Sequence, residues 1–169
     1  MASRGKNVDL RMRNIKAIVI HCSATKETDD YTVEELKRDH AARGFSAPFG
    51  YHYYIKRDGS IIEGRVIERI GAHVKGSNSN SIGICYEGGL DSNGKPKDTR
   101  TDSQKQALRE TIYDVLKRVS QHQDVKEIDI CGHRDFSPDL DGDGIIERHE
   151  WMKACPCFEA RPEYKDLLG

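Results

Sequence analysis

Short apolar runs alternate with polar stretches along this chain, and several of the runs have the length and composition of β-strands. Residues 15–22, Ile-Lys-Ala-Ile-Val-Ile-His-Cys, are rich in β-branched side chains and too short for a helix, so we expect a central strand that is buried on both faces. Residues 81–86 and 128–132 are predicted to form further strands. Residues 51–56 and 60–63 flank Arg57-Asp58-Gly59, which predicts a β-hairpin.

Two helices are predicted from capping signals. Thr32-Val-Glu-Glu35 is a capping box that opens a short helix over residues 36–42, with Gly44 as its stop. Thr101-Asp-Ser-Gln104 is a second capping box, and it opens a long helix after a polar loop at 88–100. The apolar residues of the long helix recur at helical spacing and predict one broad buried face: Ala107, Leu108, Thr111, Ile112, Val115, Leu116 and Val119.

These elements predict one α/β domain over residues 15–169, with a mixed central sheet flanked by helices, after a polar tail at 1–14. A chain of 169 residues with 36% hydrophobic content can bury a core of this kind. The net charge of −1 argues against a nucleic acid or a membrane surface as partner. The chain has no apolar run of spanning length and no signal-peptide pattern at its start, so we expect a cytoplasmic protein as synthesised, and a monomer.

Five cysteines are an odd number, which argues against a complete disulfide framework. Cys22, Cys85 and Cys131 lie in apolar runs and are expected to be buried free thiols, a pattern typical of a reducing compartment. A bridge between Cys155 and Cys157 would close a very tight ring, so a metal ligand beside a bystander is favoured there.

Two histidines and one cysteine form a candidate metal site. His21 and His133 each follow a strongly apolar β segment, so they can emerge at the same edge of the sheet, and Cys155 follows His133 closely enough for a returning loop to bring it there. Three such ligands leave the fourth position of a tetrahedral zinc ion open for chemistry. Against this, a single histidine is more often structural, as expected for His40, His122 and His149, and the pattern alone leaves both interpretations open.

Four segments, in order, resemble the zinc-dependent N-acetylmuramoyl-L-alanine amidases of the phage-lysozyme and peptidoglycan-recognition-protein type. The resemblance runs from about Ile15 to Phe158, and the segments are His21–Thr25, Gly50–Gly59, Asn80–Cys85 and Lys153–Pro156. It implies zinc as cofactor, peptidoglycan or a muropeptide as substrate, and hydrolysis of the amide bond between N-acetylmuramic acid and L-alanine. It also implies that the zinc ligands are His21, His133 and Cys155 and that the zinc cleft lies at the sheet edge.

The same resemblance assigns Tyr51 and Lys153 to the catalytic tyrosine and lysine positions of the family. Lys153 would offer a cationic donor to the oxyanion, and Tyr51 would orient the water or assist proton transfer. A solvated lysine and a strand tyrosine are the structural alternatives. A loop between His133 and Lys153 is longer than in the shortest phage members, so the spacing of this part of the site differs from theirs.

Two further residues are predicted to contact the substrate. His73 matches a histidine that lines the cleft of the family, and Asn80 could hydrogen-bond a peptide or sugar amide. For Asn80 a loop-capping role is an equally good account.

The long loop carries a calcium-binding pattern. The loop matches the 12-residue calcium template in its acidic residues, in the glycine at position six, Gly144, and in Ile145, whose carbonyl oxygen would be a ligand. The acidic residues of the match are Asp139, Asp141, Asp143 and Glu150. An Asp- and Gly-rich surface turn is the alternative, and no helix precedes the loop as in a paired EF-hand. The hypothesis is a structural calcium ion that fixes the segment from Trp151 to Cys155.

The leading functional hypothesis is a phage- or prophage-type lysin that acts on the cell wall after its release. A cytosolic amidase that recycles soluble muropeptides shares the same chemistry. A non-catalytic peptidoglycan-binding module is a third hypothesis, and an intact His/His/Cys set argues against it.

Overall fold

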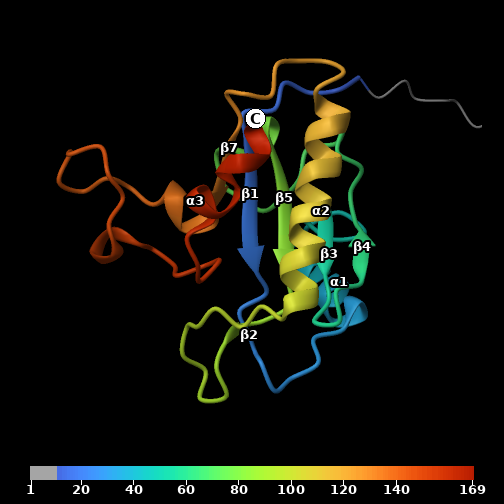
Figure 1. The fold of residues 1–169 in the computed structure, drawn as a ribbon. Helices are drawn as coiled ribbons and strands as arrows, with labels where there is room; N and C mark the ends of the chain where they lie inside the picture. Colours follow the sequence, from blue (N-terminus) through green and yellow to red (C-terminus); the bar gives the residue numbers. More distant parts are fainter. Residues whose placement is uncertain (1–10) are drawn as a thin grey trace, which may run out of the picture.

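The computed structural model describes residues 11–169 and has a five-stranded sheet at its centre, in the order β4-β3-β5-β1-β7 (Figure 1). Strands β1 (Ala17–Cys22), β5 (Ser81–Tyr86) and β7 (Asp129–Gly132) are parallel, and β3 (Tyr53–Ile55) joins β5 in parallel register. Only β4 (Ile61–Glu63) runs antiparallel, as the partner of β3 in the predicted hairpin. The mixed central sheet that the sequence predicts is therefore confirmed.

The register of the parallel strands determines where the site lies. His21 pairs with Cys85, and Ile20 pairs with Gly132, so His21 and the residue after Gly132 leave the sheet at the same edge. This edge is the carboxyl end of the strands, at the lower end of the β1 and β5 arrows in Figure 1. Every residue of β1 is buried, as expected for an interior strand.

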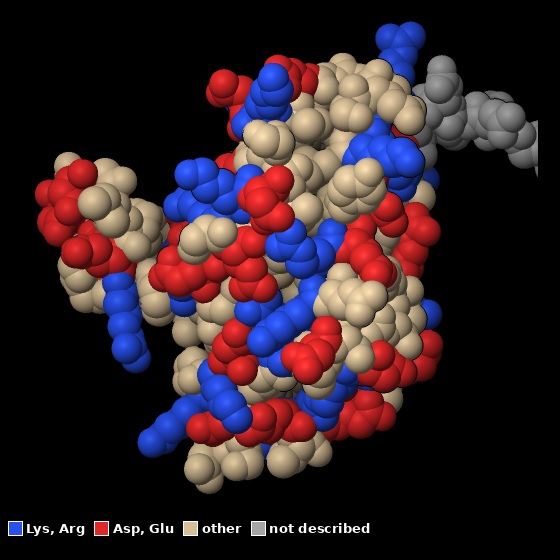
Figure 2. All heavy atoms as spheres, viewed as in Figure 1, with Lys and Arg blue, Asp and Glu red and all other residues tan. Residues whose placement is uncertain are grey.

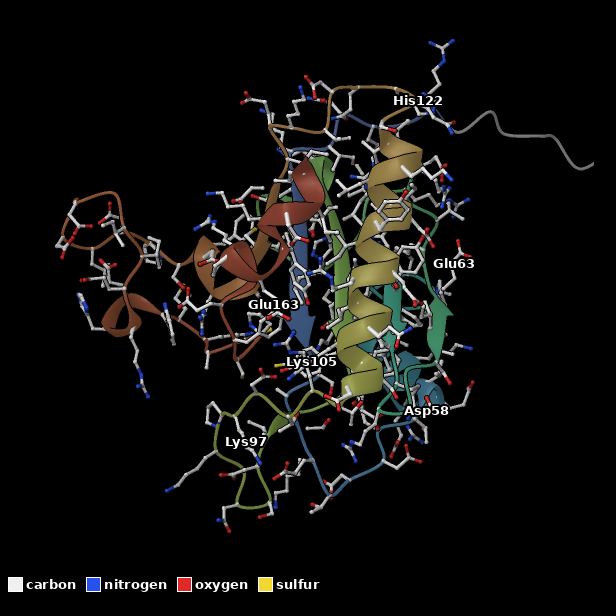
Figure 3. All side chains as sticks on the ribbon, viewed as in Figure 1. Asp58, Glu63, Lys97, Lys105, His122 and Glu163 are labelled. Atoms are coloured by element: carbon white, nitrogen blue, oxygen red, sulfur yellow. The ribbon has the colours of Figure 1, made fainter. Side chains whose placement is uncertain are left out.

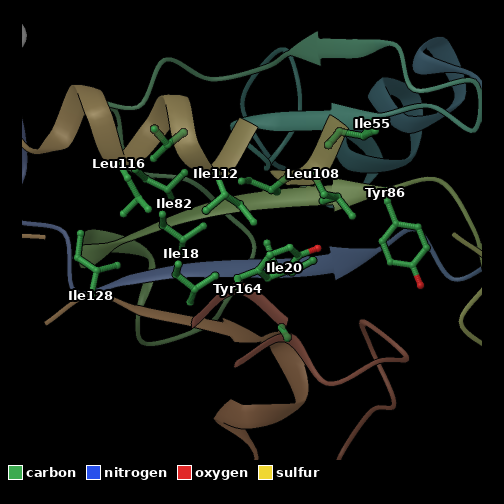
Figure 4. Close-up of a cluster of buried hydrophobic side chains, with 14 of the residues drawn as sticks. Ile18, Ile20, Ile55, Ile82, Tyr86, Leu108, Ile112, Leu116, Ile128 and Tyr164 are labelled. Carbon is green, nitrogen blue, oxygen red and sulfur yellow. The ribbon is translucent and has the colours of Figure 1, made fainter. Parts of the chain in front are cut away.

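Helix α2 (Asp102–Val119) covers one face of the sheet and builds the main core with it (Figure 4). Its seven predicted core residues are all buried, and Gln104 is buried with them. They pack on side chains that alternate along β1 and β5, among them Ile18, Ile20, Ile82 and Ile84. Because side chains alternate between the two faces of a strand, His21 points to the opposite face from Ile20.

Both predicted capping boxes are present. Thr32 caps α1 (Val33–Ala42) and Thr101 caps α2, each by accepting a hydrogen bond from the backbone of the third helical residue. The predicted loop at 88–100 contains a short strand, β6 (Gly89–Leu90), which pairs with β2 (Thr25–Lys26). No local pattern in the sequence predicts this pair. Two residues per strand are too few to leave a periodic signal.

The chain after β7 consists of short turns and helices. The 3-10 turn η2 (His133–Phe136) follows β7 directly, a long loop leads to η3 (Arg148–Glu150), and α3 (Ala160–Tyr164) and η4 (Lys165–Leu168) close the chain. Helix α3 packs against β7. A remaining 3-10 turn, η1 (Asn78–Asn80), leads into β5.

Residues just before the predicted end of the N-terminal tail at residue 14 contact the domain. Residues 1–10 lie outside the described part of the chain, but Met12 packs on the main core and Arg13 is bound to the domain. The Arg13 guanidinium donates to the carbonyl oxygens of Ile67 at 2.9 Å and Ser81 at 3.0 Å. Such contacts of a single long cation leave no periodic trace in the sequence.

Lysine and arginine side chains are interspersed with aspartate and glutamate on the face shown in Figure 2, and no broad basic surface is visible there. The loop over residues 139–150 projects from the body of the domain in the same view. Within residues 11–169, no helix combines the length and apolar character needed to cross a membrane.

Candidate metal centre

His21, His133 and Cys155 come together at the carboxyl edge of the sheet. One ligand atom from each lies within 4.8 Å of the others, and the rings of His21 and His133 are 4.6 Å apart between centroids. His21 is the penultimate residue of β1, His133 begins the turn after β7, and Cys155 returns from the long loop. A tetrahedral ion with bonds of about 2.0–2.3 Å holds its ligand atoms roughly 3.5 Å apart, so two imidazoles and a thiol at this spacing fit zinc.

His21 is held in the form that a metal ligand needs. The residue is 2% exposed, and burial, followed by the neighbouring charges of His73 and His133, lowers its pKa well below the usual range. Nε2 of His21 lies 2.9 Å from Nδ1 of His73. This contact leaves Nδ1 of His21 available as a ligand atom, and a hydrogen bond to the other ring nitrogen is the usual way in which a protein orients a histidine ligand.

Cys155 is tied to the ends of two central strands. The backbone N–H of Cys22 donates to Cys155 Sγ at 3.1 Å, and the N–H of Arg134 donates to the Cys155 carbonyl at 2.8 Å. The hydroxyl of Tyr86 donates to the carbonyl of Pro156 at 2.6 Å. The third ligand is therefore positioned by β1, β5 and the turn after β7, and not by the projecting loop alone.

Tyr51 and Lys153 both lie near this cluster. The Tyr51 ring is 5.1 Å from His21 and 5.2 Å from His40 between centroids, so it lies against both rings. Burial raises the pKa of Tyr51 well above its usual range, which keeps the hydroxyl protonated. Lys153 is exposed and lines a cavity of about 150 Å³ together with His133, and its charge helps to lower the pKa of His133 after burial.

The two predicted substrate contacts are placed differently from each other. His73 lies beside His21, and its Nε2 is 3.2 Å from Ser81 Oγ, so both of its ring nitrogens have protein partners. Asn80 lies in η1, directly before β5, and its carbonyl accepts from the N–H of Lys16. At about 3.3 Å per residue it is roughly 16 Å along the strands from His21. The structure brings His73 to the metal ligands but not Asn80, and substrate contact by either residue stays a prediction.

The acidic loop forms two overlapping groups. Carboxylate oxygens of Asp139, Asp141 and Asp143 lie within 4.8 Å of one another, whereas Glu150 groups with Asp141 and His149. Asp139 accepts from the N–H groups of Gly142 and Gly144, and Glu150 from those of Leu140 and Glu147. Ile145 is 62% exposed. Calcium at these residues stays a prediction.

The structure also gives roles to residues that no motif in the sequence singles out. Ser81 and Cys22 support His73 and Cys155, as described above, and His52 is a structural histidine: its Nδ1 accepts from Gly83 N–H and its Nε2 donates to the Arg69 carbonyl. Arg134 stacks on Trp151, with Cζ 3.9 Å from the ring centroid. Its position next to His133 was the one signal in the sequence that could have identified it. His122, by contrast, lies beyond the far end of α2 (Figure 3).

All five cysteines are free, and Cys22, Cys85 and Cys131 are buried, as predicted. Burial raises the pKa of Cys85 and Cys131, which keeps both thiols protonated and inert.

Comparisons with known proteins identify the family of this chain. The model of the N-acetylmuramoyl-L-alanine amidase family matches residues 11–157. The endolysin of Klebsiella phage KP32 is 37% identical over 144 residues, which cover 85% of this chain and 82% of the endolysin. The fold is shared with the solved structure of the amidase LysC from Clostridium intestinale, with a TM-score of 0.65 and 22% identity over 92% of this chain and 86% of that one. It is also shared with the structure of bumblebee PGRP-SA, with a TM-score of 0.64 and 21% identity over 95% of this chain and 89% of that one.

Proposed function

The chain belongs to the N-acetylmuramoyl-L-alanine amidase family, and on this premise we propose that it hydrolyses the amide bond between N-acetylmuramic acid and L-alanine in peptidoglycan, with zinc as cofactor. The observation that carries the proposal is the convergence of His21, His133 and Cys155 at the carboxyl edge of the sheet. These three residues would hold the ion. When bound, zinc supplies an activated water and polarises the scissile carbonyl.

The residues around the ligands have separate tasks in this proposal. Lys153 donates a charged hydrogen bond to the oxyanion that develops on the scissile carbonyl, a contribution of about 3–4 kcal/mol in comparable sites. Tyr51 keeps its proton at neutral pH and donates a hydrogen bond to the attacking water or to the leaving amine. His73 holds the His21 ring, and the N–H of Cys22 stabilises the Cys155 thiolate.

The similarity to an endolysin supports a lysin that acts on the polymer. A recycling amidase would cut soluble muropeptides with the same residues. The non-catalytic module is disfavoured by the intact donor set, because a protein that only binds peptidoglycan has no need for an open metal position.

The test is incubation with purified sacculi and, separately, with soluble muropeptides, with and without a zinc chelator. Mass spectrometry of the released peptide is the readout. We expect zinc-dependent release, faster from sacculi than from soluble fragments. No zinc-dependent release from either substrate would overturn the proposal, and release from soluble fragments alone would replace the lysin with the recycling enzyme.

A pair of cysteine variants tests the ligand assignment. Cys155→Ser is expected to lose bound zinc and activity. Cys157→Ser is the matched control, because Cys157 Sγ donates to the Gly89 carbonyl and is not one of the three clustered ligands. A Cys155→Ser variant that keeps stoichiometric zinc and full activity would overturn the assignment.

A further inference from the structure

Lys153 has no partner that fixes its side chain. It is exposed, and within residues 11–169 its Nζ takes part in no hydrogen bond or ion pair. The direction of this side chain therefore depends on the backbone that carries it, the segment from Trp151 to Cys155. An oxyanion donor is effective only when it is held in place before the reaction.

The turn after β7 holds this segment at three points. The Arg134 guanidinium stacks on the Trp151 ring, Ser137 Oγ accepts from the N–H of Met152 at 3.1 Å, and the N–H of Arg134 donates to the Cys155 carbonyl at 2.8 Å. Lys153 lies between these contacts. The turn that supplies His133 to the metal site thus also anchors the lysine segment on both sides.

Arg134 is suited to this task by its own surroundings. The residue is 7% exposed although it carries a charge, and Nη2 donates to Glu159 Oε1 at 2.9 Å. A planar guanidinium at 3.9 Å from the centroid of an indole ring gains cation–π attraction, which a flexible ammonium group reproduces poorly. Arg134 and Trp151 line both a cavity of about 530 Å³, which includes Lys153, and one of about 370 Å³ beside Gly144–Ile146, so the stacked pair separates the two hollows.

We propose that Arg134 is a positioning residue for the hydrolysis: its stacking on Trp151 fixes the backbone of Lys153 and so aims Nζ at the reacting carbonyl. The inference rests on the proposed role of Lys153 in the amidase reaction. It concerns the Arg134 side chain alone, because the bond from Arg134 N–H to Cys155 is made by the main chain and survives any substitution except proline. A side-chain variant can therefore loosen Lys153 without releasing the metal ligand.

Activity of matched variants tests the stacking. Arg134→Lys keeps the charge but loses the planar group, Trp151→Leu loses the aromatic face, and Trp151→Phe keeps such a face. We expect Arg134→Lys and Trp151→Leu to lower kcat about tenfold, with KM and zinc content unchanged. The Trp151→Phe variant should keep most of the wild-type kcat. Arg118→Lys, an exposed arginine on α2 that pairs with Glu68, is the control and should stay within about twofold of wild type.

Fluorescence gives a readout that does not depend on catalysis. Trp151 is the single tryptophan of the chain, so its emission directly reports the stacking of Arg134 on this ring. In Arg134→Lys we expect stronger quenching by acrylamide and a shift of the emission to longer wavelength, with no change in Arg118→Lys. If wild type released no peptide from any substrate, the proposed amidase function would fail, whereas the fluorescence would still show whether Arg134 holds Trp151.

Two results would overturn the inference. One is an Arg134→Lys variant with the kcat and the quenching of wild type. The other is a loss of activity that follows a loss of bound zinc, because the defect would then lie in the metal site. If Trp151→Leu fails to fold, the comparison of Arg134→Lys with Trp151→Phe decides between the outcomes.

Discussion

The close approach of Gly132 to Pro156 gives the sharpest test of how the third ligand is positioned. A Cβ atom on Gly132 would lie 2.4 Å from Pro156 Cδ and 3.0 Å from Cγ. The backbone of Gly132, at φ −95° and ψ 161°, is open to alanine, so the conflict in Gly132→Ala is purely steric. Gly132 directly precedes one ligand, His133, and Pro156 directly follows another, Cys155.

The size of the effect follows from the geometry. Ordinary contacts of a Cβ atom begin at 3.4 Å, so the Pro156 ring must retreat by 3.4 − 2.4 = 1.0 Å. The Pro156 ring is rigid, and the main-chain carbonyl of Pro156 is held by the buried hydroxyl of Tyr86. A retreat of the ring therefore also moves the adjoining residue, Cys155. Metal–ligand distances tolerate only about 0.2 Å. We expect zinc affinity to fall about 10- to 100-fold and turnover about 100-fold, with a loss of about 1–3 kcal/mol in stability.

Zinc affinity is measured by competition with a chromogenic chelator, turnover by peptide release from a muropeptide, and stability by thermal unfolding. Gly44→Ala is the control: it lies beyond α1 at φ +80° with no atom within 4 Å of the added Cβ, so it costs stability through backbone strain alone and should keep its zinc. A Gly132→Ala protein that binds zinc and turns over within about twofold of wild type would refute the reasoning.

Three other predictions concern stability and the acidic loop. Burial lowers the pKa of His52 to about 4, below its value of about 6.5 in the unfolded chain. The unfolded state therefore binds a proton first as the pH drops from 6.5 to 4. Over this range the free energy of unfolding falls by at most about 1.4 kcal/mol per pH unit. Measured by urea unfolding, the free energy of unfolding should change less with pH in His52→Gln than in wild type. An equal pH dependence in the two proteins would contradict the assignment. The Arg100 side chain is 3% exposed and lies between Asp98 and Glu163, so its replacement by methionine should cost about 3 kcal/mol. The same replacement of the half-buried Arg109 should cost less than about 1 kcal/mol, and similar losses in thermal unfolding would contradict this. Calcium should raise the melting temperature of the zinc-loaded protein, EGTA should reverse the rise, and Glu150→Gln should abolish it, whereas an unchanged melting temperature in wild type would exclude a structural calcium ion.

Local signals accounted for most of the elements. The capping boxes at Thr32 and Thr101, the β-branched run of β1 and the apolar stripe of α2 are confirmed, because each depends on neighbours within a few residues of the chain. The pair β2 and β6, the place of Arg13 and the anchoring of Cys155 were missed. Each of these arises from contacts between residues far apart in sequence, and two-residue strands or single side chains carry no periodicity.

The sequence by itself determined the fold class, the family and the three residues that come together as a candidate zinc site. Strand ends, chain order and motif residues can be recognised from residues that are close together in the chain. Only the tertiary structure decided how those residues are held. The register of β1, β5 and β7 places His21 and His133 at one edge, His73 turns the His21 ring, and the N–H of Cys22 meets the Cys155 thiol across 133 positions of the chain. The third ligand follows the acidic loop in the sequence, and the structure ties it to the central sheet because buried backbone groups there need hydrogen-bond partners.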